Sequence, residues 1–139
     1  MSKRFIIAAA AGSVTMLLVG FLLYGIIFAD LFREGALTIP GVMKQKPEIL
    51  WILVGQVGFG ILVTLIVSWR SATSFADGAL TGAVFGFLMA VGYDFAQYGT
   101  SNIWTLTATL LDPFITAVLV GSAGGVIGFM LGRGELDQE

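Results

Sequence analysis

The chain contains no cysteine and no histidine among its 139 residues. Without cysteine there are no disulfides and no thiol nucleophiles, and without histidine there is no imidazole base. The two absences also remove the usual protein ligands of zinc and haem. No phosphate-binding loop, metal-binding motif or nucleophile elbow occurs in the sequence. The sequence therefore predicts no cofactor and no enzymatic activity, because acid–base catalysis relies on histidine or on tuned carboxylates.

Charged residues are scarce as well. They make up 12% of the chain, compared with about 25% in an ordinary soluble domain. Hydrophobic residues make up 57%, and the mean hydropathy is +0.93. The formal net charge of -2 provides no basic surface for a nucleic acid, so nucleic acid is not an expected partner. This composition predicts an integral membrane protein surrounded by the lipid bilayer.

Four runs are apolar and long enough to cross a membrane as helices. The hydrocarbon core is about 30 Å thick, and a helix needs about 20 residues to cross it. The predicted spans cover about residues 5–29, 49–69, 77–98 and 112–132. None shows the alternating pattern of a β-barrel wall. We therefore expect an all-α fold, in which residues 1–139 form a single integral membrane domain built as a four-transmembrane-helix bundle.

The segment before the last span is harder to interpret. Residues 100–111, TSNIWTLTATLL, carry no charge and fit either an interfacial helix or a re-entrant segment. Asp112 followed by Pro113 is typical of a helix N-cap and the first helical position. The pair predicts that the fourth helix starts there.

The Lys and Arg residues in the connections predict the orientation. The cytoplasmic side of a membrane carries the excess of these residues, which favours placing both termini in the cytoplasm. The inner side would then hold Lys3, Arg4, Arg70 and Arg133, and the outer side would hold Arg33, Lys44 and Lys46.

Glycine is abundant, with 19 residues, and its spacing is informative. In the third and fourth spans it recurs every four residues, which places the glycines on one helix face. Helices associate in lipid mainly by close packing, and glycine lets two backbones approach. These faces are predicted to pack against each other, as in a glycine zipper, or against a second subunit of an oligomer. The glycines are Gly78, Gly82, Gly86, Gly121, Gly124, Gly125, Gly128 and Gly132.

The second and fourth spans also resemble each other. Residues 51–70 and 114–133 both end in arginine, and Gly58 falls on Gly121 when the two are aligned. The alignment indicates a possible two-fold repeat of a helical hairpin, with both copies in parallel orientation.

The stretch GYDFAQYG, residues 92–99, places a carboxylate near the end of an apolar run. With the N-terminus inside, Asp94 lies about 24 Å along the third span, near the outer surface. Its spacing to Gln97 and Tyr98 puts all three side chains on one helix face. The polar residues proposed with them as candidates for a pocket at this end of the bundle are Asp30, Gln56, Tyr93 and Asp112, and Tyr24, Trp51, Asn102 and Trp104 are expected at the same end.

Two interpretations of this polar end remain open. In the first, the helices simply end here, where solvated carboxylates and interfacial aromatic residues are normal. In the second, Asp94, Gln56 and Asp30 line an outward-facing pocket that binds a cation or an amine, or carries a proton. Asp94 is the strongest member, because the helix is expected to continue past it and because ionisable residues inside a membrane are functional candidates.

The layout and several short motifs resemble small four-helix membrane proteins of unknown function found in bacteria. The motifs are GFLLYGIIFADLF at the end of the first span, GYDFAQYGTSN, the DPF start of the last span, and its GFMLGR ending. The resemblance implies a four-helix fold in a bacterial inner (plasma) membrane, and it implies no activity. The chain does not resemble the small multidrug transporters, which carry a membrane-embedded glutamate in the first span.

Three classes of function follow from these observations. The first and preferred class is a non-catalytic membrane protein, an accessory or structural subunit that packs against itself as a homo-oligomer or within a larger membrane complex. The second is a small transporter or channel with its pocket around Asp94. The third and least favoured is an enzyme.

Overall fold

The computed structural model describes residues 2–35, 44 and 46–133. The described part is helical and contains no strand, so the all-α class is confirmed. Among the described residues, four helices are long and apolar enough to cross a membrane. The elements are α1 (Lys3–Leu22) with its π-helical extension η1 (Leu23–Ile27), α2 (Ala29–Gly35), α3 (Ile49–Trp69), α4 (Phe75–Thr100) and α5 (Leu106–Gly132).

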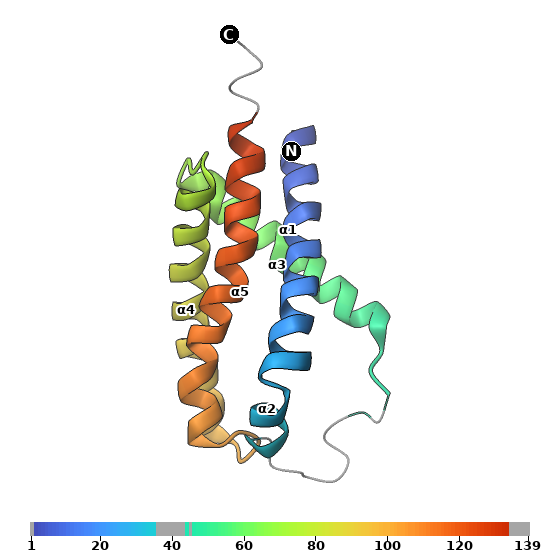
Figure 1. Ribbon diagram of the computed structural model, residues 1–139, viewed down its shortest axis with the longest axis vertical. Helices are drawn as coiled ribbons and strands as arrows, with labels where there is room; N and C mark the ends of the chain where they lie inside the picture. Colours follow the sequence, from blue (N-terminus) through green and yellow to red (C-terminus); the bar gives the residue numbers. More distant parts are fainter. Residues whose placement is uncertain (1, 36–43, 45, 134–139) are drawn as a thin grey trace.

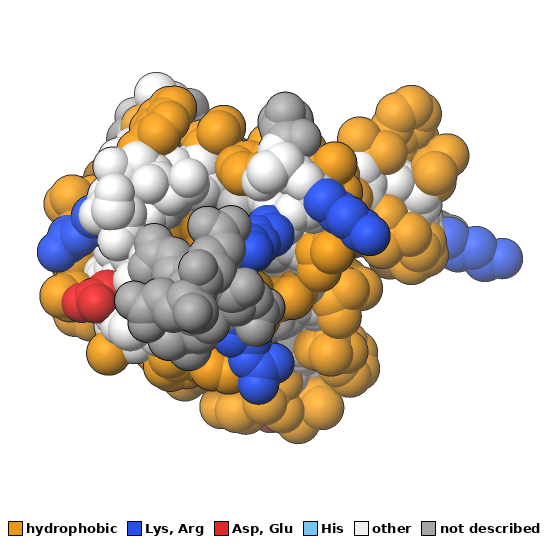
Figure 2. All heavy atoms as spheres, turned by 90° about the horizontal axis from the view of Figure 1, so that it is seen from above, with side chains coloured by type: hydrophobic (Ala, Val, Ile, Leu, Met, Phe, Trp, Pro, Cys, Tyr) orange, Lys and Arg blue, Asp and Glu red, His pale blue; other side chains and the backbone are white. Residues whose placement is uncertain are grey.

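The long helices form an up-and-down arrangement in which α5 is central (Figure 1). α4 packs along α5, and α1 packs against both α5 and α3. The start of α1 and the end of α5 lie at the same end of the bundle (Figure 1). Seen from that end, Lys and Arg side chains lie among hydrophobic side chains and other polar or backbone atoms, with an acidic side chain at one edge (Figure 2).

The helix α3 diverges from the rest of the bundle (Figure 1). Its second half packs through the buried residues Gly60, Val63, Thr64 and Val67. In its first half, residues 49–59 are all exposed except the half-buried Gln56. An exposed apolar helix is expected in lipid, because lipid tails are as apolar as the side chains they touch.

The contact between α4 and α5 is made backbone to backbone. A Cβ atom added at Gly78 would collide with the carbonyl group of Gly124, and one added at Gly82 would collide with the carbonyl oxygen of Val120. Conversely, a Cβ at Gly124 would collide with the Gly78 carbonyl oxygen. Only glycine permits this approach, and the close contact fixes the register of the two helices along their length.

The predicted start of the fourth span at Asp112 is wrong. The helix α5 begins at Leu106, and its N-cap is Thr105, whose side chain accepts a 3.3 Å hydrogen bond from the Ala108 backbone N–H. Asp112 and Pro113 therefore lie inside the helix. Proline has no N–H, so the Thr109 carbonyl loses its usual partner within the helix.

Candidate ligand-binding site

The polar centre of the site joins the first span to the last. The Tyr24 hydroxyl donates a hydrogen bond of 2.7 Å to Asp112 Oδ1. The Thr116 hydroxyl lies 3.0 Å from the Tyr24 hydroxyl and donates to Asp112 Oδ2 at 3.3 Å. Asp112 and Thr116 are one helical turn apart on α5, which places their side chains on one face. Both oxygens of Asp112 thus have a donor within the protein.

Tyr24 belongs to the π-helical segment η1 rather than to the regular part of α1. The Phe28 backbone N–H donates to the Leu23 carbonyl at 2.8 Å, a hydrogen bond over five residues instead of four. Such wider turns are rare in proteins as a whole, and those that occur are frequently found at functional sites. Here the altered turn lies at the residue that contacts Asp112.

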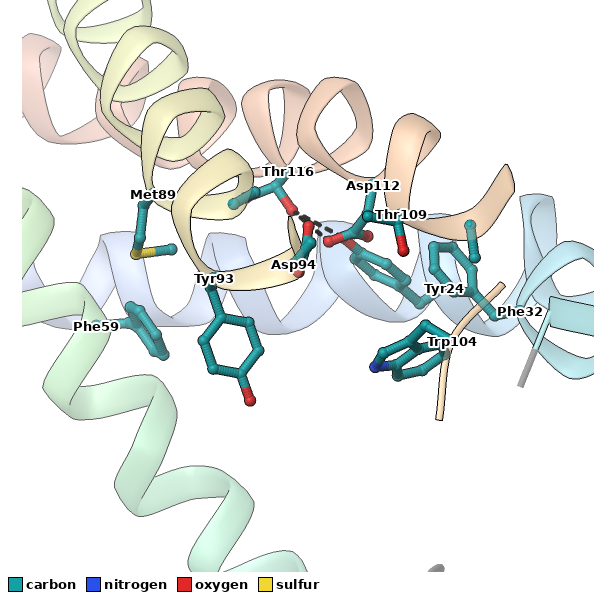
Figure 3. Close-up of a pocket in the computed structure, with 12 residues that line it drawn as sticks. Tyr24, Phe32, Phe59, Met89, Tyr93, Asp94, Trp104, Thr109, Asp112 and Thr116 are labelled. Carbon is teal, nitrogen blue, oxygen red and sulfur yellow. Dashed lines mark hydrogen bonds between the residues drawn. The ribbon is translucent and has the colours of Figure 1, made fainter. Parts of the chain in front are cut away.

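Asp94 lies on α4 with its carboxyl group beside that of Asp112 (Figure 3). Its Oδ2 atom is buried and has no hydrogen-bond partner among the described residues. A buried acceptor without a donor costs about 1–3 kcal/mol, and more when it is charged. The contrast with Asp112 is the main chemical feature of the site, since each oxygen of Asp112 has a donor and Asp94 Oδ2 has none.

The two carboxylates lie at the same depth. Each is six residues from the nearer end of its helix, which corresponds to about 9 Å. The helices have 26 and 27 residues, so both are about 40 Å long. Centred on a hydrocarbon core of about 30 Å, such helices place both carboxylates about 4 Å inside its boundary.

The carboxylates open onto a cleft of about 720 Å³, which we call the Asp94 cleft. Clefts of about 300–1,000 Å³ hold small-molecule ligands in other proteins. Apart from the carboxylates and a few hydroxyl groups, its walls are apolar or aromatic. They consist of Tyr24, Phe32, Phe59, Met89, Ala90, Tyr93, Asp94, Trp104, Ala108, Thr109, Asp112 and Thr116 (Figure 3).

An aromatic row forms one side of the cleft. The Phe32 ring lies 4.9 Å from the Tyr24 ring and 6.0 Å from the Trp104 ring, measured between centroids. Met89 and Phe59 lie on the other side of the carboxylates (Figure 3). The polar atoms thus lie between two apolar regions, an arrangement suited to a ligand that is mostly apolar with one polar group.

The residues named from the sequence are distributed over different surfaces. Asp94, Asp112 and Tyr93 line the Asp94 cleft, although the side chain of Tyr93 is largely exposed. Asp30 does not line it, because its side chain is 91% exposed and lies 3.9 Å from Arg33. Gln97 and Tyr98 are not on its walls either.

Gln56 lines a different groove, of about 480 Å³, between α1 and α3. Its neighbours there include Ser13, Val57 and Ile61, and the other walls are apolar. The groove is separate from the Asp94 cleft, since no residue lines both.

Several residues of the Asp94 cleft were not among the candidates from the sequence. The spacing of Asp112 and Thr116 is a signal that could have paired them, because it places both on one helix face. No such signal exists for Phe59 and Met89, which reach the cleft only because α3 and α4 pass close to it. The residues missed are Tyr24, Phe32, Phe59, Met89, Ala90, Trp104, Ala108, Thr109 and Thr116.

No protein family, curated protein or solved structure matches this chain. The function therefore has to be inferred from the geometry of the cleft and of the helices around it.

Proposed function

We propose that this chain is a non-catalytic membrane protein that binds a small molecule in the Asp94 cleft, as the binding step of a small carrier. The observation that supports the proposal is that Asp94, whose Oδ2 atom is unpaired, lies on the wall of a largely apolar cleft beside Asp112, whose two oxygens both have donors. Carboxylates inside a membrane are costly and mark substrate or ion sites in many membrane proteins.

The close contact of α4 and α5 gives the glycines a role in this proposal. Asp94 is on α4 and Asp112 is on α5, so their relative position depends on how these helices pack. The contacts of Gly78, Gly82 and Gly86 with α5 hold the two backbones in one register. A binding site needs such rigid support, because a small displacement of a polar group weakens its interactions.

The test is a binding experiment in phosphatidylcholine nanodiscs with tryptophan fluorescence as the signal. The chain has Trp104 in the cleft, and its other tryptophans, Trp51 and Trp69, are exposed on α3. Replacing both with phenylalanine leaves Trp104 as the sole reporter. The probes are 2-phenylethylamine, 2-phenylethanol and 3-phenylpropanoate, which share an apolar body and differ in the charge of the polar group.

We expect a saturable change in Trp104 emission with at least one of these probes. The control is a protein that retains only Trp69, which ends α3 about 15 Å beyond the cleft-lining Phe59 and reports partition of the probe into lipid. An equal response from both reporters, or no saturable response from Trp104, would contradict a binding site in the cleft.

A second candidate function is that of a subunit of a homo-oligomer or a larger membrane complex. The diverging α3 favours it, because its first half contacts little of its own chain and presents the amide of Gln56 to an apolar groove. Side-chain amides within membranes form hydrogen bonds between helices. We propose a second copy or a larger subunit as the surface that would cover α3.

Native mass spectrometry after gentle extraction tests this candidate. Disulfide cross-linking between single introduced cysteines shows which helix forms the interface, because the natural chain has no cysteine. Val54 on α3 and Val118 on α5 are similarly exposed, at 55% and 57%. A homo-oligomer through α3 predicts dimers from Val54→Cys and none from Val118→Cys. A monomeric mass together with no cross-linking at Val54 would leave α3 facing lipid.

A further inference from the structure

Three of the four hydroxyl groups on the walls of the Asp94 cleft already have acceptors, and the fourth belongs to the largely exposed Tyr93. Tyr24 and Thr116 donate to Asp112, and the Thr109 hydroxyl donates to the Thr105 carbonyl at 3.0 Å. Asp94 Oδ2 is the atom left without a partner among the described residues. Because a carboxylate oxygen accepts hydrogen bonds, a ligand with an N–H or O–H donor would give the Asp94 carboxylate the partner that it lacks.

The charge of the cleft restricts that donor further. Two carboxylates lie side by side on its walls, and none of the described residues that line it is Lys or Arg. Like charges this close repel strongly in surroundings of low dielectric, whereas a positive charge is attracted by both. A hydrogen bond between a cationic donor and a carboxylate is also about twice as strong as one between neutral groups.

The apolar walls distinguish an organic cation from a metal ion. Calcium needs 6–8 oxygen ligands, whereas most of this cleft is lined by carbon. No group of three or more Asp, Glu, His or Cys residues that could hold a metal occurs within the described parts of the chain. The rings of Trp104 and Phe32 instead provide faces that attract organic cations, and Met89 and Phe59 provide apolar contact.

We propose that the Asp94 cleft recognises a protonated amine carried on an apolar body, with its N–H group donating to the Asp94 carboxylate. This inference rests on the proposed binding function and names the class of its ligand. The ammonium group lies in the cleft against the Asp94 carboxylate, with Asp112 adding a second negative charge nearby. The body extends over Met89 and Phe59 on one side or over Phe32 and Trp104 on the other (Figure 3).

Two sources can supply this chemistry in a membrane, a free hydrophobic amine or the headgroup of phosphatidylethanolamine. The lipid headgroup carries a phosphate close to its ammonium, and this phosphate would approach the carboxylates of Asp94 and Asp112. Because that contact is repulsive, the free amine is the better fit.

The experiment compares the three phenyl probes on the Trp104-only protein. We expect 2-phenylethylamine to bind at least ~30-fold more tightly than 2-phenylethanol, because a charged N–H donor makes a stronger hydrogen bond to a carboxylate than a neutral hydroxyl does. At about 1.4 kcal/mol for each tenfold, ~30-fold corresponds to about 2 kcal/mol. The anion 3-phenylpropanoate should bind most weakly. Nanodiscs of phosphatidylcholine alone, and with added phosphatidylethanolamine, separate the two sources. A free-amine site keeps its response to the probe in both membranes, whereas a headgroup site loses it when phosphatidylethanolamine is present.

Substitutions test whether the amine binds to the Asp94 carboxylate. Asp94→Asn keeps the shape but removes the charge, so the amine should lose ~10–100-fold in affinity while the alcohol changes by less than ~3-fold. Asp94→Glu retains the charge and should preserve the order of the probes. The matched control is Asp30→Asn, which makes the same change of charge on a side chain outside the cleft, and it should bind as the wild type does.

The outcomes separate the two levels of the proposal. Equal binding of amine and alcohol would overturn the amine inference and leave the binding function intact. No saturable binding of any probe would overturn both. Tighter binding of 3-phenylpropanoate would show that the carboxylates do not set the specificity. Because the wild type alone gives this order, an Asp94→Asn variant that fails to fold does not weaken the test.

Discussion

The hydroxyl of Tyr24 donates a hydrogen bond of 2.7 Å to Asp112 Oδ1 across 88 positions of the sequence. The bond connects the π-helical end of the first span to the interior of the last one. It also holds the Asp112 carboxylate next to Asp94, so the geometry of the Asp94 cleft depends on a contact between distant segments.

Tyr24→Phe should weaken both the fold and the site, because Asp112 Oδ1 loses its donor inside the bundle. Hydrogen bonds between membrane helices contribute about 0.6 kcal/mol on average and up to about 1.7 kcal/mol. We expect a loss near the upper value, since a charged acceptor is left unpaired. Equilibrium unfolding in mixed micelles measures it. Tyr93→Phe removes a hydroxyl from an exposed ring of the same cleft and should cost little. Equal losses from the two variants would show that the Tyr24 bond adds no stability.

Gly82→Leu should force α4 and α5 apart. A Cβ at Gly82 would already collide with the Val120 carbonyl oxygen, and a backbone cannot move aside as a side chain can. Overpacking of this kind costs about 1–3 kcal/mol or more, so the melting temperature should fall.

Gly92→Leu is the matched control for this substitution. It makes the same change on the same helix, where a Cβ would meet nothing within 4 Å. Its melting temperature should stay level or rise, because leucine favours helix more than glycine does. If Gly82→Leu melted like Gly92→Leu, the close contact between α4 and α5 would not be needed for stability.

The number of spans and the helical class could be predicted from the sequence, because both follow from long uncharged runs. The start of the last helix could not be placed correctly from the Asp112–Pro113 pair. Both this pair and Thr105 are typical of the start of a helix. The helix begins after Thr105 because the apolar residues 106–111 are themselves helical. Within a membrane the cost of a proline is small enough to be outweighed by neighbouring contacts.

The candidate site was predictable only in part, because residue spacing describes one helix at a time. Asp94 and Asp112 could both be assigned to the same end of the bundle, but the sequence does not show that their carboxyl groups meet. Gln56 was expected at the same level, yet the oblique path of α3 carries it into a separate groove. The possible repeat and the resemblance to bacterial four-helix proteins stay predictions.

The orientation predicts which side of the membrane each connection reaches. Because the chain has no cysteine, a single introduced cysteine reports its own position. Asn102 follows α4 and Ser71 follows α3, and both are exposed. With cytoplasmic termini, Asn102→Cys should react with an impermeant maleimide in intact cells, and Ser71→Cys only after the membrane is permeabilised. The opposite pattern would invert the orientation, and reaction of both from one side would contradict the four spans.

Phe32→Ala tests whether the aromatic row encloses the ligand. Phe32 lies on the short helix α2 and bridges the rings of Tyr24 and Trp104, so removing its ring opens one side of the Asp94 cleft to water. Interactions of an ammonium with aromatic faces contribute about 0.5–2 kcal/mol, which corresponds to a loss of about 2- to 30-fold in amine affinity. The Trp104 emission should also shift to longer wavelength. Phe28→Ala is the control, because Phe28 is half-buried at the same end of the bundle but does not line the cleft. If both variants bound 2-phenylethylamine as the wild type does, the ligand would have to be enclosed by the Met89 and Phe59 side instead.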